Sequence, residues 1–87
     1  MGVDHGKVDD YEKAIEHYTK AIKINPKLVK AYNARCLSYS QLGQFERAIQ
    51  DCDKAIQLNS NYFDAYHNRG IAYDNLGQHK RAIKDYD

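Results

Sequence analysis

Apolar residues recur along most of the chain with the period of an α-helix. Between residues 11 and 22 they return every three or four positions, and the pattern repeats between residues 45 and 56. Such spacing places the apolar side chains on one helix face and the intervening charged residues on the other. The first stripe comprises Tyr11, Ala14, Ile15, Tyr18, Ala21 and Ile22, and the second Phe45, Ala48, Ile49, Cys52, Ala55 and Ile56.

Two shorter stripes and the residues that interrupt the pattern complete a set of five predicted helices. The shorter stripes are Tyr32, Cys36, Tyr39 and Leu42, and Tyr66, Gly70, Tyr73 and Leu76. Gly43 and Gly77 follow them, where a helix end favours a left-handed residue. Asn25-Pro26 and the Asn-Ser-Asn stretch at 59–61 close the longer stripes. We predict helices at about 10–24, 28–42, 45–58, 62–76 and from 79 onward, and their short connections make neighbours antiparallel.

The predicted helix pairs recur every 34 residues. Residues 31–53 align without a gap on residues 65–87, and residues 11–26 align on residues 45–60. The chain therefore divides into a leader at 1–8, the second helix of a partial repeat at 9–28, a complete repeat at 29–62 and a truncated repeat at 63–87. The last copy ends on RAIKDYD, inside a predicted helix. We expect a fragment of a longer array, with a poorly ordered or foreign leader.

The residues at equivalent places in the three copies resemble the tetratricopeptide repeat family. The matching positions are Tyr32, Cys36, Tyr39, Gly43, Ala48, Cys52, Ala55 and Ser60 in the middle copy, Tyr66, Gly70, Tyr73, Gly77, Ala82 and Tyr86 in the last, and Ala14, Tyr18, Ala21 and Pro26 in the first. The resemblance covers about residues 9–87, and Ser60 departs from its usual proline. It implies an all-α fold of antiparallel helix-turn-helix repeats stacked as a right-handed superhelical solenoid.

The cysteines are a second departure from the family pattern. Cys36 and Cys52 stand where the last copy has Gly70 and Tyr86, so two residues of intermediate size replace a small and a large one. The conserved volume predicts that the two cysteines lie near each other across a helix hairpin. We expect free thiols in the core, because buried helical cysteines are commonly unpaired, with a disulfide as the other possibility.

Composition narrows the classes of function. The 87 residues carry a formal charge of +1, without the basic excess typical of nucleic-acid binders. No apolar run approaches the roughly 18 residues that a membrane span needs, and the N-terminus lacks the apolar stretch of a signal peptide. We therefore expect a soluble chain without nucleic-acid or membrane partners, with the cytoplasm as the favoured compartment.

The polar residues show no pattern of catalysis or of cofactor or metal binding. There is no phosphate-binding loop, nucleophile elbow or zinc motif, and we interpret the histidines as solvent-facing. These are His5, His17, His67 and His79. We interpret Asp51 and Asp53 as solvated helix positions with weak pairing along the helix. Arg35 and Arg69, one repeat apart, are expected to cover neighbouring side chains with their stems.

The positions left over on the first helix of each pair form the candidate binding site. Stacked helix hairpins curve, and their first helices line a concave surface. The candidate groove comprises Lys30, Asn33, Leu37, Ser40 and Gln41 on one helix, beside Ala34, and Asp64, His67, Asn68, Ile71, Asp74 and Asn75 on the next. Its amides, single charges and aliphatic side chains favour a protein or peptide partner, which predicts a non-catalytic interaction scaffold.

Three alternatives compete with this interpretation. Some family members clamp a chaperone's C-terminal carboxylates with an Asn, a Lys and an Arg; Asn68 and Lys30 match this set, but Ala34 replaces the arginine and the order along the chain is reversed. RNA binding is disfavoured by Asp64 and Asp74 on the expected face. Uncapped repeat ends instead favour a dimer or end-to-end oligomer, with helix swapping as one way to form it. The candidate residues for self-association are Tyr11, Tyr18, Tyr73, Ile83 and Tyr86.

Overall fold

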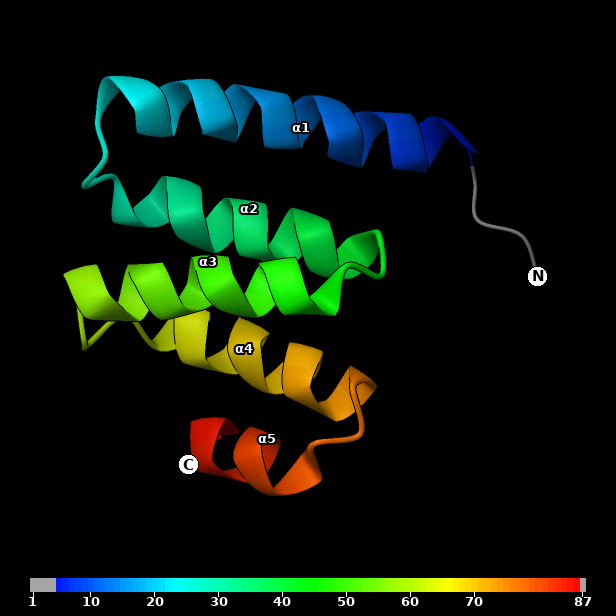
Figure 1. The fold of residues 1–87 in the computed structure, drawn as a ribbon, viewed down its shortest axis with the longest axis vertical. Helices are drawn as coiled ribbons and strands as arrows, with labels where there is room; N and C mark the ends of the chain where they lie inside the picture. The colour runs from blue at the N-terminus through cyan, green and yellow to red at the C-terminus, as the bar shows by residue number, and fades with distance from the viewer. Residues whose placement is uncertain (1–4, 87) are drawn as a thin grey trace.

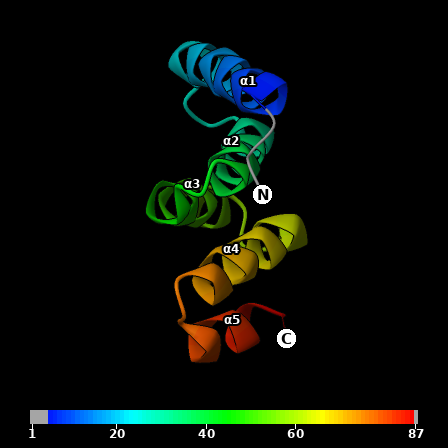
Figure 2. The ribbon, with the colours of Figure 1, turned by 90° about the vertical axis from the view of Figure 1, so that its right-hand side faces the viewer.

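The chain forms a single file of antiparallel helices (Figure 1). The computed structural model describes residues 5–86, and within that range it contains α1 (His5–Ile24), α2 (Val29–Gln41), α3 (Phe45–Leu58), α4 (Phe63–Asn75) and α5 (His79–Tyr86). Each helix packs on the next in chain order, and α2 also contacts α4. Figure 2 shows the axes turning from one helix to the next, with α1 and α5 at opposite ends of the file. The all-α solenoid expected from the sequence is confirmed.

Helix boundaries agree with the predicted ones to within one residue, except at the start of α1. This helix begins at His5, five residues before the predicted start at residue 10. Val8 explains the difference, because it precedes Tyr11 and Ile15 by three and seven residues and is half-buried with them. The single glycine in this turn costs a helix only about 1 kcal/mol. The part of the leader at residues 1–4 lies outside the described residues.

The turns after α2 and α4 are built in the same way. Gly43 and Gly77 have φ values of 77° and 79°, in the left-handed region that glycine adopts without strain. The Gln44 amide donates to the Tyr39 carbonyl at 2.9 Å, and the Gly43 amide donates to the Ser40 carbonyl at 3.0 Å. Equivalent bonds close α4. This double closure is the Schellman motif, and it confirms the predicted role of both glycines.

The turns after α1 and α3 also match, although one contains proline and the other serine. The Asn25 Oδ1 accepts a hydrogen bond from the amide two residues on at 3.1 Å, and Asn59 does so at 3.0 Å. In each turn a tyrosine hydroxyl from the following helix donates at 3.1 Å to the carbonyl of Pro26 or Ser60. Because these contacts use the backbone carbonyl, serine replaces proline without changing the turn.

Small side chains make up most of the core. The fully buried residues are Cys36, Ala48, Cys52, Ala55, Ala65, Ala72 and Ala82, and Ala31 and Tyr32 are nearly so. Larger apolar side chains such as Ile49 and Ile56 are half-buried around this centre. Alanine at the crossing points lets the helices approach closely, and the stability of each helix depends on its neighbours.

Cys36 and Cys52 form a disulfide between α2 and α3. Their predicted proximity is confirmed, with Cα atoms 5.6 Å apart, but the expectation of free thiols is wrong. In the next hairpin the expected exchange of volume is present: a Cβ added to Gly70 would lie 2.6 Å from the Tyr86 ring. Tyr86 therefore occupies the space that a side chain at position 70 would need.

Candidate functional site

Two arginines hold α2 and α4 in place. The Arg35 Nε and Nη2 each donate to the Asp51 carboxylate at 2.7 Å, and Nη1 donates to the Thr19 hydroxyl at 3.1 Å. Arg35 on α2 thus links its partner α3 to the preceding helix α1. The two-point bond with Asp51 raises the pKa of Arg35, although burial opposes this, so the guanidinium stays charged.

The same arrangement recurs 34 residues later. Arg69 donates from Nε and Nη2 to Asp85 on α5 at 2.9 and 2.6 Å, and from Nη1 to Asp53 on α3 at 2.8 Å. Asp53 occupies the place that Thr19 has in the first set. We call these two sets the arginine bridges: Arg35 with Asp51 and Thr19, and Arg69 with Asp85 and Asp53.

The arginine bridges correct two expectations from the sequence. Asp51 is not a solvated position, because only 6% of the residue is exposed, whereas the exposed Asp53 pairs with another helix rather than along its own. Arg35 and Arg69 are ion-pair donors as well as packing residues. A signal for this was present: Arg35–Asp51 and Arg69–Asp85 share a spacing of 16 residues.

Tyrosine rings enclose the arginines of the bridges. The Arg35 guanidinium lies 5.9 Å from the Tyr32 ring centre and 6.0 Å from that of Tyr39. Arg69 has equivalent contacts with Tyr66 and Tyr73, at 5.4 and 5.9 Å. A cation over an aromatic face is attracted to it, and the rings limit the rotamers of the arginine. Because the rings hold each arginine in place, the bridges to neighbouring helices fix the roll of α2 and α4 about their axes, and therefore which side chains the two helices present on their shared surface.

The surface shared by α2 and α4 brings together most of the predicted groove residues. The Asn68 side-chain amide donates to the Asn33 Oδ1 at 2.9 Å, which joins the two helices directly. Farther along them is an open cleft of about 250 Å³. It is lined by Leu37, Ser40, Gln41, Phe45, Asn68, Ile71 and Asn75. We call this surface the α2–α4 face. Its lining within the cleft is aliphatic, aromatic or neutral and polar.

A second hollow adjoins the cleft and extends the surface to α1. Its volume is about 410 Å³. It shares Ser40, Gln41 and Phe45 with the cleft, and Val8 and Glu12 of α1 form its far side with the α2–α3 turn. The Ser40 Oγ at this shared wall is buried and has no hydrogen-bond partner among the described residues. Phe45 was predicted only as a core residue, and nothing in its helical stripe distinguishes it from one.

The remaining predicted groove residues lie elsewhere on α2 and α4. Lys30 and Asp64 are exposed near the starts of these helices. Asp74 pairs with the His79 Nδ1 at 2.9 Å and accepts one hydrogen bond from the Tyr86 hydroxyl at 3.0 Å, and these contacts lower the pKa of Asp74. Partial burial, and then the bond to Asp74, raise the pKa of Tyr86.

His67 also lies toward α5 rather than toward α2. Its ring centre is 5.7 Å from that of Tyr86. His67, like His17 and His79, is exposed, as expected from the sequence; the side chain of His5 lies outside the described residues. Among residues 5–86 no three His, Cys, Asp or Glu side chains gather as they would around a metal ion, and no helix is long and apolar enough to cross a bilayer.

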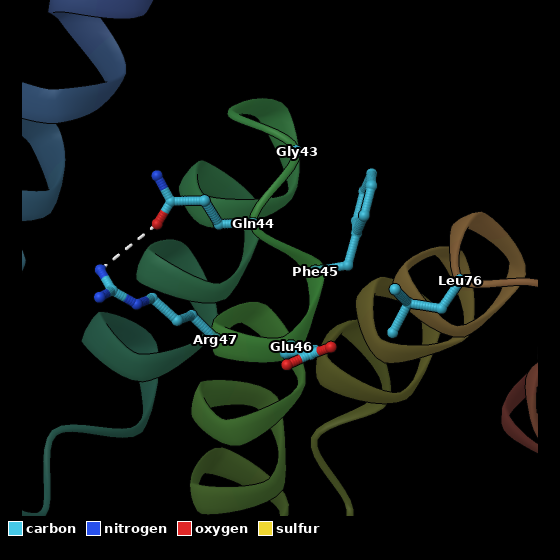
Figure 3. A pocket seen from close by; sticks show the side chains of 6 residues that line it. All are labelled: Gly43, Gln44, Phe45, Glu46, Arg47 and Leu76. Atoms are coloured by element: carbon cyan, nitrogen blue, oxygen red, sulfur yellow. Dashed lines mark hydrogen bonds between the residues drawn. The ribbon is translucent and has the colours of Figure 1, made fainter.

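Two further hollows flank the α2–α4 face. One of about 490 Å³ lies at the start of α3, where Phe45 of α3 and Leu76, the residue after α4, line it and Arg47 donates to Gln44 at 3.4 Å (Figure 3). Another of about 470 Å³ lies between α4 and α5, beside Phe63 and Tyr86. Phe63 is 78% exposed, which the sequence pattern did not indicate.

The predicted self-association residues differ in accessibility. Ile83 and Tyr86 on α5 are 58% and 46% exposed. Tyr11 and Tyr18 are half-buried on α1, and Tyr73 is half-buried between Arg69 and Arg81. Only the α5 pair therefore presents a large apolar surface to solvent.

The fold and the recurring contacts define a class of protein. Tetratricopeptide repeat models match residues 29–62 and 52–84, and a related TPR repeat model matches residues 9–43. The chain belongs to the tetratricopeptide repeat family.

Particular relatives are similar over short segments. Hsp70-Hsp90 organizing protein 1 of Arabidopsis thaliana is 52% identical over 42 residues, which are 48% of this chain and 7% of that protein. The protein of the same name from Glycine max is 51% identical over 37 residues, 42% of this chain and 6% of that protein. The chain thus spans a small part of the curated relatives it matches.

Solved structures match nearly the whole chain. The Arabidopsis OM64 TPR domain has 35% identity and a TM-score of 0.88, covering 90% of this chain and 64% of that one. The second TPR domain of Spaghetti (RPAP3), solved with the HSP90 peptide SRMEEVD, has 34% identity and a TM-score of 0.85, covering 87% and 70%. The second TPR domain of human RPAP3, solved with the HSP70 peptide SGPTIEEVD, has 34% identity and a TM-score of 0.83, covering 87% and 63%.

Proposed function

We propose that this chain is a non-catalytic protein-interaction module that binds a peptide segment of a partner across the α2–α4 face. The observation that carries the proposal is the cleft itself, where Leu37, Phe45 and Ile71 provide apolar surface beside the amides of Gln41 and Asn68. A hollow with an apolar floor and a few polar groups suits a side chain together with its peptide backbone. Similar TPR domains have been solved with peptides, which supports the same class of ligand here.

The face is suited to binding because it is held rigid. The arginine bridges and the Asn33–Asn68 hydrogen bond fix α2 and α4 relative to each other before a ligand arrives. A preorganised surface loses little conformational freedom on binding, so more of the contact energy appears as affinity. The hydroxyl of Ser40, in the wall that the two hollows share, is a buried polar group without a hydrogen-bond partner among the described residues.

Selection from a displayed library of random heptapeptides tests the proposal. Peptides that bind the wild type should not bind the Leu37→Glu variant, because the new carboxylate would lie in the apolar part of the cleft. Leu37 is 43% exposed, so the substitution leaves the core intact. Ile24→Glu is the matched control, since Ile24 is 87% exposed and lies outside the cleft lining. Peptides that bind both variants as well as the wild type would contradict the proposal.

Self-association through α5 is a second candidate function. The exposed Ile83 and Tyr86 form an apolar surface beside the hollow that contains Phe63. Burying these side chains against a second copy would remove apolar area from water. Sedimentation at micromolar concentration should then show a dimer or larger species that Ile83→Asp converts to monomer. A well-folded wild-type monomer of 10.1 kDa would exclude this function.

A further inference from the structure

We infer that the peptide bound on the α2–α4 face carries both an aliphatic side chain and a cationic one, and that Glu12 of α1 receives the cation. This inference rests on the proposed function and specifies its ligand. It concerns the two adjoining hollows as one track, which begins at Ile71 on α4, crosses Leu37 and Gln41 on α2, and ends at Glu12 on α1.

The continuity of the track comes from three shared residues. Ser40, Gln41 and Phe45 line both hollows, so an extended chain that leaves one hollow enters the other by passing over these shared residues on α2 and α3. From end to end the track runs from α4 over α2 and the start of α3 to α1. An extended peptide advances by about 3.3 Å per residue, so a track of this extent accommodates several residues rather than one side chain.

Charge selects the ligand at one end of the track. Among the described residues that line the two hollows, Glu12 is the one charged side chain. It is exposed, and no salt bridge to it is present within residues 5–86. A lysine or arginine of the peptide would complement Glu12, whereas an acidic residue would be repelled by it.

The apolar end selects a different side chain. Leu37 and Ile71 belong to neighbouring helices, and the ring of Phe45 stands at the junction of the hollows. The cleft holds about 250 Å³, which suits one aliphatic side chain. The amides of Asn68 and Gln41 beside it provide donors and acceptors for the peptide backbone, as a neutral site requires.

This chemistry differs from that of the peptides in the similar solved complexes. SRMEEVD contains three acidic side chains in its last four residues. The described residues that line the two hollows include no Lys or Arg, Lys30 lies elsewhere on α2, and Ala34 and Asp64 offer no positive charge to the ligand. Binding an acidic terminus favours Arg or Lys donors arranged around it. The face therefore complements a basic, aliphatic peptide better than an acidic one.

The test uses synthetic copies of a peptide recovered from the random library, measured by fluorescence polarisation on the whole chain. Exchanging the Lys or Arg of the peptide for Glu should weaken its binding to the wild type by about fivefold or more at low salt. This loss of affinity is expected when an exposed ion pair is replaced by repulsion between like charges. Glu12→Lys should reverse this preference, because the charges are then exchanged on both sides. Glu16→Lys is the matched control, since Glu16 is an exposed glutamate on α1 outside both hollows.

Three results separate this inference from the function on which it rests. Reversal of the preference by Glu12→Lys but not by Glu16→Lys supports the inference. Recovered peptides that are acidic, together with binding of SRMEEVD that Glu12→Lys leaves unchanged, would overturn the inference and leave the proposed function standing. If Leu37→Glu does not weaken the binding of any recovered peptide, both the inference and the proposed function are overturned.

Discussion

Breaking one arginine bridge should destabilise the fold far more than breaking a second, exposed contact on the same helix. We consider Asp51→Asn and Asp53→Asn, two substitutions on α3 that remove a charge with almost no change in shape. Asp51 accepts two hydrogen bonds of 2.7 Å from Arg35, and its side chain is only 8% exposed. Asp53 accepts one of 2.8 Å from Arg69, and its side chain is 51% exposed.

The magnitudes follow from burial and from the number of bonds. Hydrogen bonds to charged groups contribute about 1.5–3 kcal/mol, and Asp51→Asn leaves the Arg35 guanidinium without its countercharge, so we expect a loss of about 2–3 kcal/mol. An exposed ion pair contributes up to about 1 kcal/mol, which bounds the effect of Asp53→Asn. In a domain of this size 1 kcal/mol corresponds to about 4–8 °C in Tm. Asp51→Asn should therefore lower Tm by roughly 10–20 °C.

Thermal unfolding followed by circular dichroism, with urea unfolding as a second measure, provides the comparison. Both variants have the same change of residue type in the same helix, so differences in helix propensity cancel. A urea m-value equal to that of the wild type would show that the loss of stability does not come from a change in the unfolded state. Equal, small losses of stability for both variants would refute the reasoning, because burial and two-point bonding would then add nothing.

Three further predictions concern the first arginine bridge, the disulfide and Asp74. Thr19→Asp should raise Tm by a few degrees, with Thr19→Asn as its control, because a carboxylate there would pair with Arg35 as in the second bridge; an unchanged Tm would contradict this. Reducing the Cys36–Cys52 disulfide, which spans 16 residues, should cost about 3 kcal/mol, measured as the Tm with and without reductant, and equal values would be inconsistent with its presence. Asp74→Asn should destabilise the chain near neutral pH, and its difference from the wild type in urea unfolding should vanish as the pH falls below 3.8. Because the pKa of Asp74 is lower in the folded state than its ordinary value of 3.8, the ionised carboxylate stabilises the fold fully above pH 3.8. This stabilisation is lost as the pH falls and the carboxylate is protonated. A difference in stability between Asp74→Asn and the wild type that stays constant with pH would contradict this prediction.

Local patterns were sufficient to predict the helices, but not every boundary. The end of α2 could be predicted from Gly43, because the left-handed backbone conformation that ends a helix involves only residues that are close in the sequence. The start of α1 was missed because Val8 belongs to the apolar stripe of Tyr11 yet lies in a polar, glycine-containing stretch. A single apolar residue is a weak signal until its burial against another helix is known.

Contacts between helices were harder to predict than the helices themselves. The volume exchange between Gly70 and Tyr86 was predictable because the repeat supplied a second copy for comparison. Comparing Arg35 and Arg69 together with acidic residues 16 positions later would have revealed the arginine bridges by the same reasoning. The oxidation state of Cys36 was not accessible from the pattern, because a thiol and a disulfide fill the core equally well.

Peptide binding across the α2–α4 face is tested most directly by nuclear magnetic resonance of the labelled chain. On addition of a library-selected peptide, the Asn68 side-chain amide and the methyl groups of Leu37 and Ile71 should shift, while the methyl groups of Ile24 should not. Shifts confined to Ile83 and the rest of α5, with the α2–α4 face unchanged, would contradict the proposed site.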